Sequence, residues 1–169
     1  TYARLDLNAY YLATDCKTVV LDSDTLVLAD IAGLFDTDLN GRTVGASVDP
    51  FIPNVSSVDG LARWRDLNLT PATPYLNAGI MLVDLERWQQ RKVCQRAIDY
   101  INANFRDLRQ YDQDALNAVL VDDWTVLDSR WHVHPRTPNA LDSKLPDDPW
   151  NMHFSGRLKP WLYRARHAS

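Results

Sequence analysis

The stretch Val19-Val20-Leu21-Asp22-Ser23-Asp24-Thr25 decides the fold class, because a β-branched apolar run leads directly into two carboxylates one residue apart. The apolar run predicts a strand at 18–21. In open α/β sheets ligands bind where strands end, so Asp22 and Asp24 are suitably placed for a divalent cation. Carboxylate oxygens suit Mg²⁺ or Mn²⁺, and such metals usually bind phosphates as well. The same residues are typical of a strand-end turn, and the pattern alone leaves both interpretations open.

Composition limits the function classes that this chain can belong to. Its 169 residues are most simply one domain, 1–169, with 46% apolar and 24% charged residues, as in soluble globular proteins. A net charge of −4 argues against nucleic acid as a partner, since a phosphate-binding surface needs a basic excess. Cys16 and Cys94 lack metal-type spacing, which predicts two reduced thiols in a cytoplasmic protein. No apolar run approaches the ~20 residues of a membrane span.

Apolar periodicity and turn signals divide the chain into alternating elements. Strands are expected at 18–21, 43–48, 80–83, 124–127 and 151–154, and helices at 30–35, 84–104 and 112–121. The proline-containing segment 50–74 reads as a long loop with a short helix near 61–66. Because strands alternate with helices, the sequence predicts an α/β fold with a mixed, mostly parallel sheet flanked by helices.

A second pattern lies near the end of the chain, at 152–161. His153 follows an apolar stretch, and a neutral imidazole is a frequent metal ligand, so it suits a site with Asp22 and Asp24. Gly156 permits close backbone approach to a ligand, and Lys159 can meet an anion as a point charge. A histidine of the core followed by an ordinary turn is the simpler interpretation when this segment is considered alone.

Two further patterns are also ambiguous in isolation. Asn77-Ala78-Gly79 precedes a strand, where an amide can meet sugar hydroxyls and glycine leaves room for them. An ordinary turn entering a strand explains these residues equally well. Asp112-Gln113-Asp114 opens a helix, and acidic residues are favoured there by the macrodipole and by capping.

Together the four patterns resemble family 8 of the retaining glycosyltransferases, which includes bacterial lipopolysaccharide galactosyl- and glucosyltransferases and glycogenin. The resemblance covers about 4–161, and both the order and the spacing of the motifs match. It rests on Leu21-Asp22-Ser23-Asp24-Thr25, on 75–82 with Trp88 following, on 111–117, and on His153-Phe154-x-Gly156-x-x-Lys159-Pro160-Trp161.

This resemblance implies the GT-A fold and a UDP-sugar-dependent hexosyltransferase that uses Mn²⁺ or Mg²⁺. By that likeness Asp22, Asp24 and His153 ligate the metal, which acts as a Lewis acid toward the UDP leaving group. Asp112 and Gln113 match the catalytic positions nearest the anomeric carbon. The donor-binding positions are Asp22, Ser23, Asp24, Asn77, Ala78, Gly79, Gly156 and Lys159. The route, front-face displacement or a covalent intermediate, stays open.

The resemblance also implies partners and a missing segment. The partners are a UDP-sugar donor and a saccharide or lipid-linked glycan acceptor, as in lipopolysaccharide biosynthesis. Peripheral contact with the inner face of a membrane stays open, as do donor identity and oligomeric state. Family members carry an upstream βαβ nucleotide-binding unit, so the sequence predicts an N-terminally truncated domain that binds UDP-sugar poorly by itself.

Two other functions fit parts of the sequence. A haloacid-dehalogenase-like phosphatase also has an apolar strand followed by Asp-x-Asp-x-Thr, with Asp22 as nucleophile and Asp24 as general acid. It needs a late acidic pair, for which Asp122-Asp123 is the candidate. A non-catalytic sugar-binding fragment is the second alternative.

Overall fold

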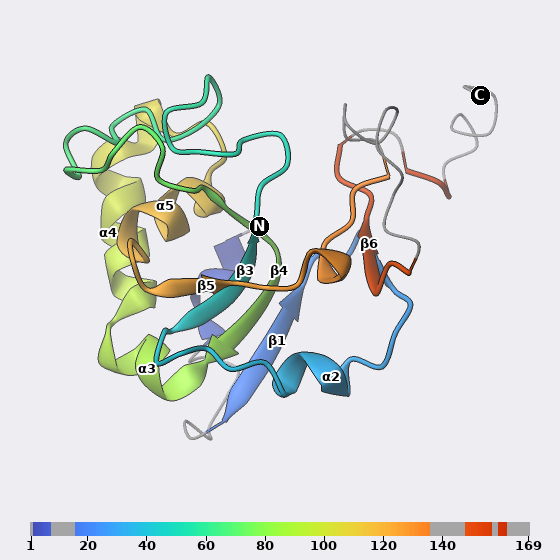
Figure 1. Ribbon diagram of the computed structural model, residues 1–169. Coiled ribbons are helices and arrows are strands. Elements are labelled where there is room, and N and C mark those ends of the chain that lie inside the picture. The colour runs from blue at the N-terminus through green and yellow to red at the C-terminus, as the bar shows by residue number, and fades with distance from the viewer. Residues whose placement is uncertain (1, 8–15, 136–147, 157–158, 162–169) are drawn as a thin grey trace.

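The computed structural model describes residues 2–7, 16–135, 148–156 and 159–161 (Figure 1). In chain order the elements are η1 (Tyr2–Leu5), β1 (Lys17–Leu21), β2 (Thr25–Val27), α2 (Ala32–Phe35), β3 (Val44–Val48), β4 (Leu76–Asp84), α3 (Leu85–Gln90), α4 (Val93–Asn104), η2 (Phe105–Asp107), α5 (Asp112–Val119), β5 (Trp124–Val126), η3 (Ser129–Trp131) and β6 (Asn151–His153). The predicted α/β class is therefore confirmed.

The main sheet has the strand order β1-β4-β3-β5 and is mostly antiparallel. β4 runs antiparallel to both of its neighbours, and only β3 and β5 pair in parallel. The prediction of a mostly parallel sheet was wrong. A parallel pair needs a long crossover, usually a helix, whereas the segment 49–75 between β3 and β4 forms turns and bends without a helix. It therefore returns the chain in the opposite direction.

The core lies on both faces of β4, which is why that strand is apolar throughout. Leu76, Ala78 and Val83 belong to the core cluster under α3, α4 and α5, on one side of the sheet in Figure 1. Ile80 and Leu82 belong to a second cluster with residues of α2 and η3. A continuous apolar strand buried on two faces is thus compatible with antiparallel pairing here.

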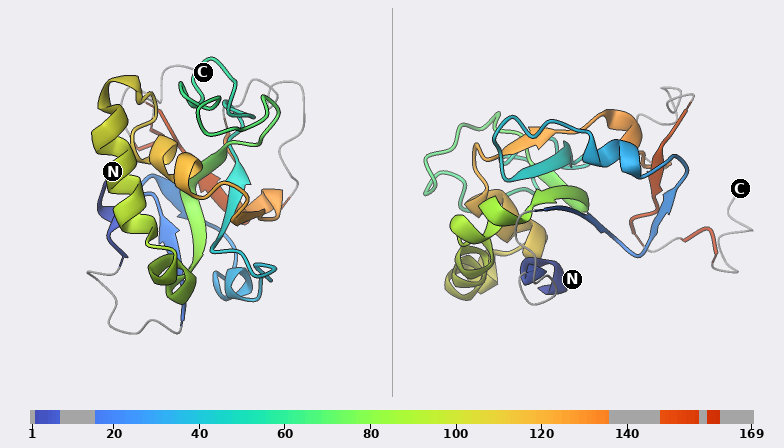
Figure 2. Two further views of the ribbon diagram at one scale, coloured as in Figure 1. Left: turned by 90° about the vertical axis from the view of Figure 1, so that its left-hand side faces the viewer. Right: turned by 90° about the horizontal axis from the view of Figure 1, so that it is seen from below.

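A bulge in β4 and a small second sheet shape the carboxyl edge of β1 and β3. Ala46 pairs with Met81 but the next residue of β3 pairs with Asn77, so 78–80 lie outside the β3 ladder. β2 pairs with β6, with Thr25 opposite His153. Figure 2 shows that this pair stands apart from the four-stranded sheet.

The predicted helix over 84–104 is divided in two. α3 ends at Gln90 and α4 begins at Val93, and Lys92 between them has a left-handed φ of 52°. No glycine or proline marks this break, so the periodicity across it was misleading. The segment near 61–66 forms turns instead of the expected short helix. Among the described helices, none has the length and apolar character that crossing a membrane requires.

Candidate functional site

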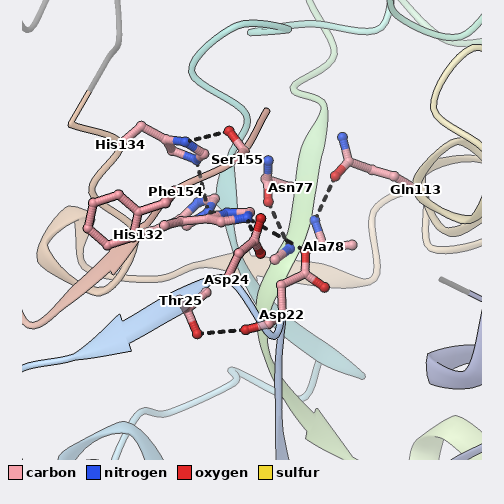
Figure 3. A network of polar contacts seen from close by, with 12 residues as sticks. Asp22, Asp24, Thr25, Asn77, Ala78, Gln113, His132, His134, Phe154 and Ser155 are labelled. Atoms are coloured by element: carbon pink, nitrogen blue, oxygen red, sulfur yellow. Dashed lines mark hydrogen bonds and ion pairs between the residues drawn. The ribbon is translucent and has the colours of Figure 1, made fainter. Parts of the chain in front are cut away.

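Strand register brings Asp22, Asp24 and His153 together. The backbone N–H of Asp22 donates to the carbonyl of Gly79 at 2.9 Å, which ties the end of β1 to β4. Both the backbone N–H and the hydroxyl of Thr25 donate to the Asp22 carbonyl, at 3.1 and 2.8 Å, and close the turn into β2. β2 then pairs with β6 and places His153 beside the two carboxylates, which Figure 3 labels together with Thr25.

In each aspartate one carboxylate oxygen contacts a cationic side chain and the other lies near His153. Asp22 Oδ1 pairs with Arg4, and Asp24 Oδ2 pairs with Lys159. The other oxygens, Asp22 Oδ2 and Asp24 Oδ1, lie 3.7 and 3.2 Å from Nε2 of His153. Two carboxylate oxygens and one imidazole nitrogen thus converge, and one ligand atom from each of the three residues lies within 4.8 Å of the others.

The electrostatics keep Asp24 and His153 in the protonation states of metal ligands. Burial opposes ionisation of Asp24, but its hydrogen bond from Lys159 and the nearby His153 hold its pKa below the ordinary value. Burial lowers the pKa of His153 despite the two carboxylates, so its imidazole is neutral near pH 7. Metal ligation needs an ionised carboxylate and a neutral imidazole.

The carboxylates open onto two adjoining cavities. One of about 670 Å³ contains Arg4, Ser23 and Lys159 in its wall, together with Asp112 and Gln113. The other, of about 380 Å³, is lined in part by His153 and Gly156. Gly156 has a φ of 90°, and a Cβ there would meet open space, so its conformation favours glycine although no neighbour excludes a side chain.

Asp112 and Gln113 are fixed at the start of α5. Arg4 joins Asp112 to Asp22, because its Nε lies 2.9 Å from Asp112 Oδ2 while its guanidinium also pairs with Asp22. Burial raises the pKa of Asp112, and Arg4 partly opposes the shift. Gln113 accepts a hydrogen bond from the Ala78 N–H at 2.9 Å and donates to Asp49 at 3.0 Å. The bulge in β4 leaves the Ala78 N–H available for this contact.

Asn77, Ala78 and Gly79 have three different surroundings. Asn77 donates to Asp49 at 2.7 Å and accepts from the Gly79 N–H at 2.7 Å, so both ends of its amide are engaged within the protein. Ala78 lines the larger cavity. Gly79 lies against the His153 ring, where an added Cβ would be 2.4 Å from Cε1.

Two more histidines stand behind His153. Nε2 of His132 lies 2.9 Å from His153 Nδ1 and 3.1 Å from His134 Nε2, while Ser155 Oγ lies 3.1 Å from His134 Nδ1. Burial and the neighbouring histidines lower the pKa of His132 to about 2; burial and His153 lower that of His134 to about 4. Both rings are therefore neutral near pH 7. Figure 3 labels His132, His134 and Ser155 of this group.

This geometry can be compared with known proteins. The sequence profile of glycosyl transferase family 8 matches residues 1–165. The chain belongs to glycosyltransferase family 8.

Relatives within family 8 extend beyond the matched region. The chain is 32% identical to General stress protein A of Bacillus subtilis (strain 168) over 164 residues, covering 89% of this chain and 54% of that protein. It is 23% identical to the glycosyltransferase GlyF of Streptococcus pneumoniae serotype 4, covering 88% of this chain and 38% of that protein. The chain thus spans about half the length, or less, of these curated relatives.

The solved structure of a galactosyltransferase has the same fold. The galactosyltransferase LgtC, in complex with donor and acceptor sugar analogues, superposes with a TM-score of 0.77 at 28% identity. The match covers 98% of this chain and 61% of that one. The expected GT-A-type architecture is therefore confirmed.

Family 8 membership also decides against the phosphatase alternative, and the geometry agrees. Asp123 accepts hydrogen bonds from the backbone N–H and hydroxyl of Thr43, at 3.2 and 2.6 Å. It lies just before β5, whose first residue pairs with the first residue of β3. Asp22 follows the end of β1, which runs parallel to β3. The acidic pair Asp122-Asp123 and Asp22 are thus at opposite ends of the sheet.

Four residues of the candidate site were not expected from the sequence: Arg4, Asp49, His132 and His134. A signal existed for three of them. Asp49 follows β3 as Asp22 follows β1, and the spacing His-x-His places two side chains on one face of an extended segment. Nothing local distinguishes Arg4, whose importance comes from contacts with residues far along the chain.

Proposed function

We propose that this protein is a metal-dependent retaining glycosyltransferase that moves a hexose from a UDP-sugar to a hydroxyl of a saccharide or lipid-linked glycan acceptor. The observation that carries this proposal is the convergence of Asp22 Oδ2, Asp24 Oδ1 and His153 Nε2 at a cavity edge flanked by Arg4 and Lys159. Family membership and the sugar analogues bound to LgtC support the substrate classes.

The donor atoms fit the expected metal. Asp22 and Asp24 each have one oxygen directed toward His153 while the other is paired with a cation, so neither carboxylate must abandon its partner to ligate. A set of carboxylate oxygens and one imidazole nitrogen suits Mn²⁺, and Mg²⁺ less well because it prefers oxygen. When bound, the metal supplies Lewis-acid stabilisation of charge on the leaving diphosphate.

Two cationic side chains suit the same diphosphate. Lys159 Nζ contacts the Asp24 carboxylate and donates to the Phe154 carbonyl at 2.6 Å, which holds the charge at the cavity wall. Arg4 holds its guanidinium between Asp22 and Asp112. Fixed positive charges of this kind stabilise developing negative charge without reorganising during the reaction.

Asp112 and Gln113 are the proposed catalytic residues. Their position beside Ala78 and Arg4 on the larger cavity is consistent with contact to the transferred sugar. Gln113 Oε1 is oriented by the Ala78 N–H, so an oxygen lone pair is held in place. A carbonyl oxygen or a carboxylate at this position stabilises an oxocarbenium-like transition state.

The test measures sugar release and transfer from a panel of UDP-hexoses with and without Mn²⁺. We expect Mn²⁺-dependent hydrolysis or transfer of one donor, lowered about 100-fold or more in Asp24→Asn, because a lost ligand weakens metal binding more than a lost outer partner. Asp36→Asn, an exposed aspartate at the end of α2, is the matched control and should retain activity. Absence of turnover with every nucleotide sugar, or unchanged activity of Asp24→Asn, contradicts the proposal.

A further inference from the structure

Three imidazole nitrogens converge behind the carboxylates in an arrangement that the transfer reaction does not require. His132 Nε2, His134 Nε2 and His153 Nδ1 are separated by 2.9 and 3.1 Å along two edges, and all three ligand atoms lie within 4.8 Å of one another. A tetrahedral zinc ion with Zn–N bonds of about 2.0–2.1 Å holds its ligand nitrogens about 3.3 Å apart. The observed spacing is therefore within a few tenths of an ångström of a zinc site along these edges.

We propose that His132, His134 and His153 form a second metal site, selective for Zn²⁺, whose occupancy excludes a metal from the Asp22–Asp24–His153 site. The three side chains are 7%, 4% and 4% exposed. Three imidazoles without a carboxylate favour zinc over Mn²⁺ or Mg²⁺, which prefer oxygen ligands. Zinc reaches the histidines from the cavity of about 380 Å³, which His153 and Ser155 line.

Two of the rings already have acceptors for the opposite nitrogen. A histidine that binds a metal through one nitrogen usually donates its other N–H to a carboxylate, carbonyl or hydroxyl, which fixes the ring orientation. His134 Nδ1 lies 3.1 Å from the Ser155 hydroxyl, and His153 Nε2 lies 3.2 Å from Asp24 Oδ1. Asp24, His153 and zinc would form the carboxylate–histidine–zinc arrangement of many zinc proteins.

The exclusion follows from the chemistry of one imidazole ring. Neutral imidazole has one N–H and one lone pair. If His153 binds zinc through Nδ1, its proton moves to Nε2 and points at Asp24, so Nε2 has no lone pair for a second metal. If Nε2 binds Mn²⁺, the proton lies on Nδ1 and is donated to His132 Nε2, 2.9 Å away. The exclusion rests on the metal role proposed above for Asp22 and Asp24, whereas the zinc site does not.

The first measurement is zinc affinity, obtained by competition with a chromophoric zinc chelator. The protein carries no polyhistidine tag, because the tag would itself bind zinc. We expect one tight site, weakened at least 100-fold in His134→Gln and nearly unchanged in His167→Gln, which alters the fourth histidine of the chain. Asp22→Asn, which removes a carboxylate from the neighbouring site, should retain tight zinc binding. Equal zinc affinity of His134→Gln and the unmodified chain, or loss of binding only in Asp22→Asn, overturns the zinc site.

A second measurement does not depend on any variant folding correctly. Zinc X-ray absorption of the unmodified chain counts imidazole ligands through their multiple-scattering pattern. Three imidazoles are expected at the proposed site, whereas one imidazole with carboxylate oxygens places zinc between Asp22 and Asp24 and overturns the assignment.

The exclusion has its own readout, which is independent of catalysis. Mn²⁺ bound to the chain loses the sharp electron paramagnetic resonance signal of the free ion. One equivalent of Zn²⁺ should restore that signal in the unmodified chain and leave it suppressed in His134→Gln. If zinc and manganese bind together with undiminished affinity, the exclusion is refuted.

Discussion

Replacing Gly79 by alanine tests whether the His153 ring has one permitted position. An ideal Cβ at this residue would lie 2.4 Å from His153 Cε1, 2.5 Å from Nδ1 and 2.9 Å from Asn77 Oδ1. Ordinary van der Waals contact begins at 3.4 Å, so the ring must move by about 1 Å or the strand must yield. The backbone of Gly79 is not in the left-handed region, so alanine can adopt its conformation. The cost of the substitution therefore comes from the steric overlap of the new Cβ with the His153 ring and Asn77.

The expected loss has two parts. Overpacking of this kind destabilises a folded protein by about 1–3 kcal/mol. A metal site tolerates ligand displacements of only about 0.2 Å, so a shift of about 1 Å should lower Mn²⁺ affinity by about 100-fold or more. Chemical denaturation measures the first quantity, and titration of Mn²⁺ followed by paramagnetic resonance measures the second.

Gly45→Ala is the matched control for Gly79→Ala. The added Cβ would approach Leu127 Cδ2 at 2.8 Å and Leu39 Cδ2 at 2.9 Å, which are ends of flexible side chains in the core. It should lower stability while leaving Mn²⁺ affinity unchanged. If a folded Gly79→Ala protein binds Mn²⁺ as tightly as the unmodified chain, the reasoning about the His153 ring is refuted.

Three further predictions concern contacts away from Asp22 and Asp24. Asp114→Asn should cost about 2–4 kcal/mol in urea denaturation, because Asp114 accepts from a tyrosine hydroxyl and two backbone amides at 2.6–2.8 Å; a loss under 1 kcal/mol would contradict this. The Asn117 side-chain amide bonds the backbone N–H and C=O of Leu76 at 2.7 and 2.9 Å, and Asn117→Ala removes both bonds. The free energy of unfolding should fall by a similar amount, about 2–4 kcal/mol. An unchanged denaturation midpoint would show that water replaces the amide. Burial and a nearby carboxylate raise the pKa of the Cys94 thiol. At pH 8, Cys94 in the Cys16→Ser variant should therefore be alkylated more slowly than the exposed Cys16 in the Cys94→Ser variant, and its rate should increase as the pH rises. The opposite order of rates would refute the shift.

Local sequence was sufficient to predict the strand and helix that contribute most residues of the candidate site. The apolar run at 18–21 ends in Asp22 as expected, and Asp112-Gln113-Asp114 does open a helix. The directions of the strands were not predictable in the same way. A buried run such as 80–83 shows that both faces of a strand are covered, but it does not show which way the neighbouring strands run. The short helix expected near 61–66 suited a parallel crossover, and that helix does not form.

The contacts that complete the site depend on residues far apart in the sequence. Lys159 and Asp24 are 135 positions apart, and Arg4 meets Asp112 across a similar distance along the chain. No periodicity encodes such pairs. Residue chemistry made His153 a candidate partner of Asp22, but only the resemblance to a family placed Lys159 near it. The resemblance did not extend to His132 and His134, whose His-x-His spacing was the sole local sign.

Because β2 pairs with β6, a metal ion bound at the proposed site would stabilise the fold as well as take part in the chemistry. A cation held by Asp22, Asp24 and His153 cross-links positions about 130 residues apart, a span between 24 and 153 comparable to that of a long disulfide loop. Unlike a disulfide, such an ion would leave the unfolded chain, so it would stabilise the fold according to its concentration relative to its dissociation constant, by about 2.7 kcal/mol at a hundredfold excess. No disulfide joins Cys16 and Cys94. If the proposed metal site is occupied, removal of the metal by a chelator should therefore lower the thermal stability of the protein as well as its activity.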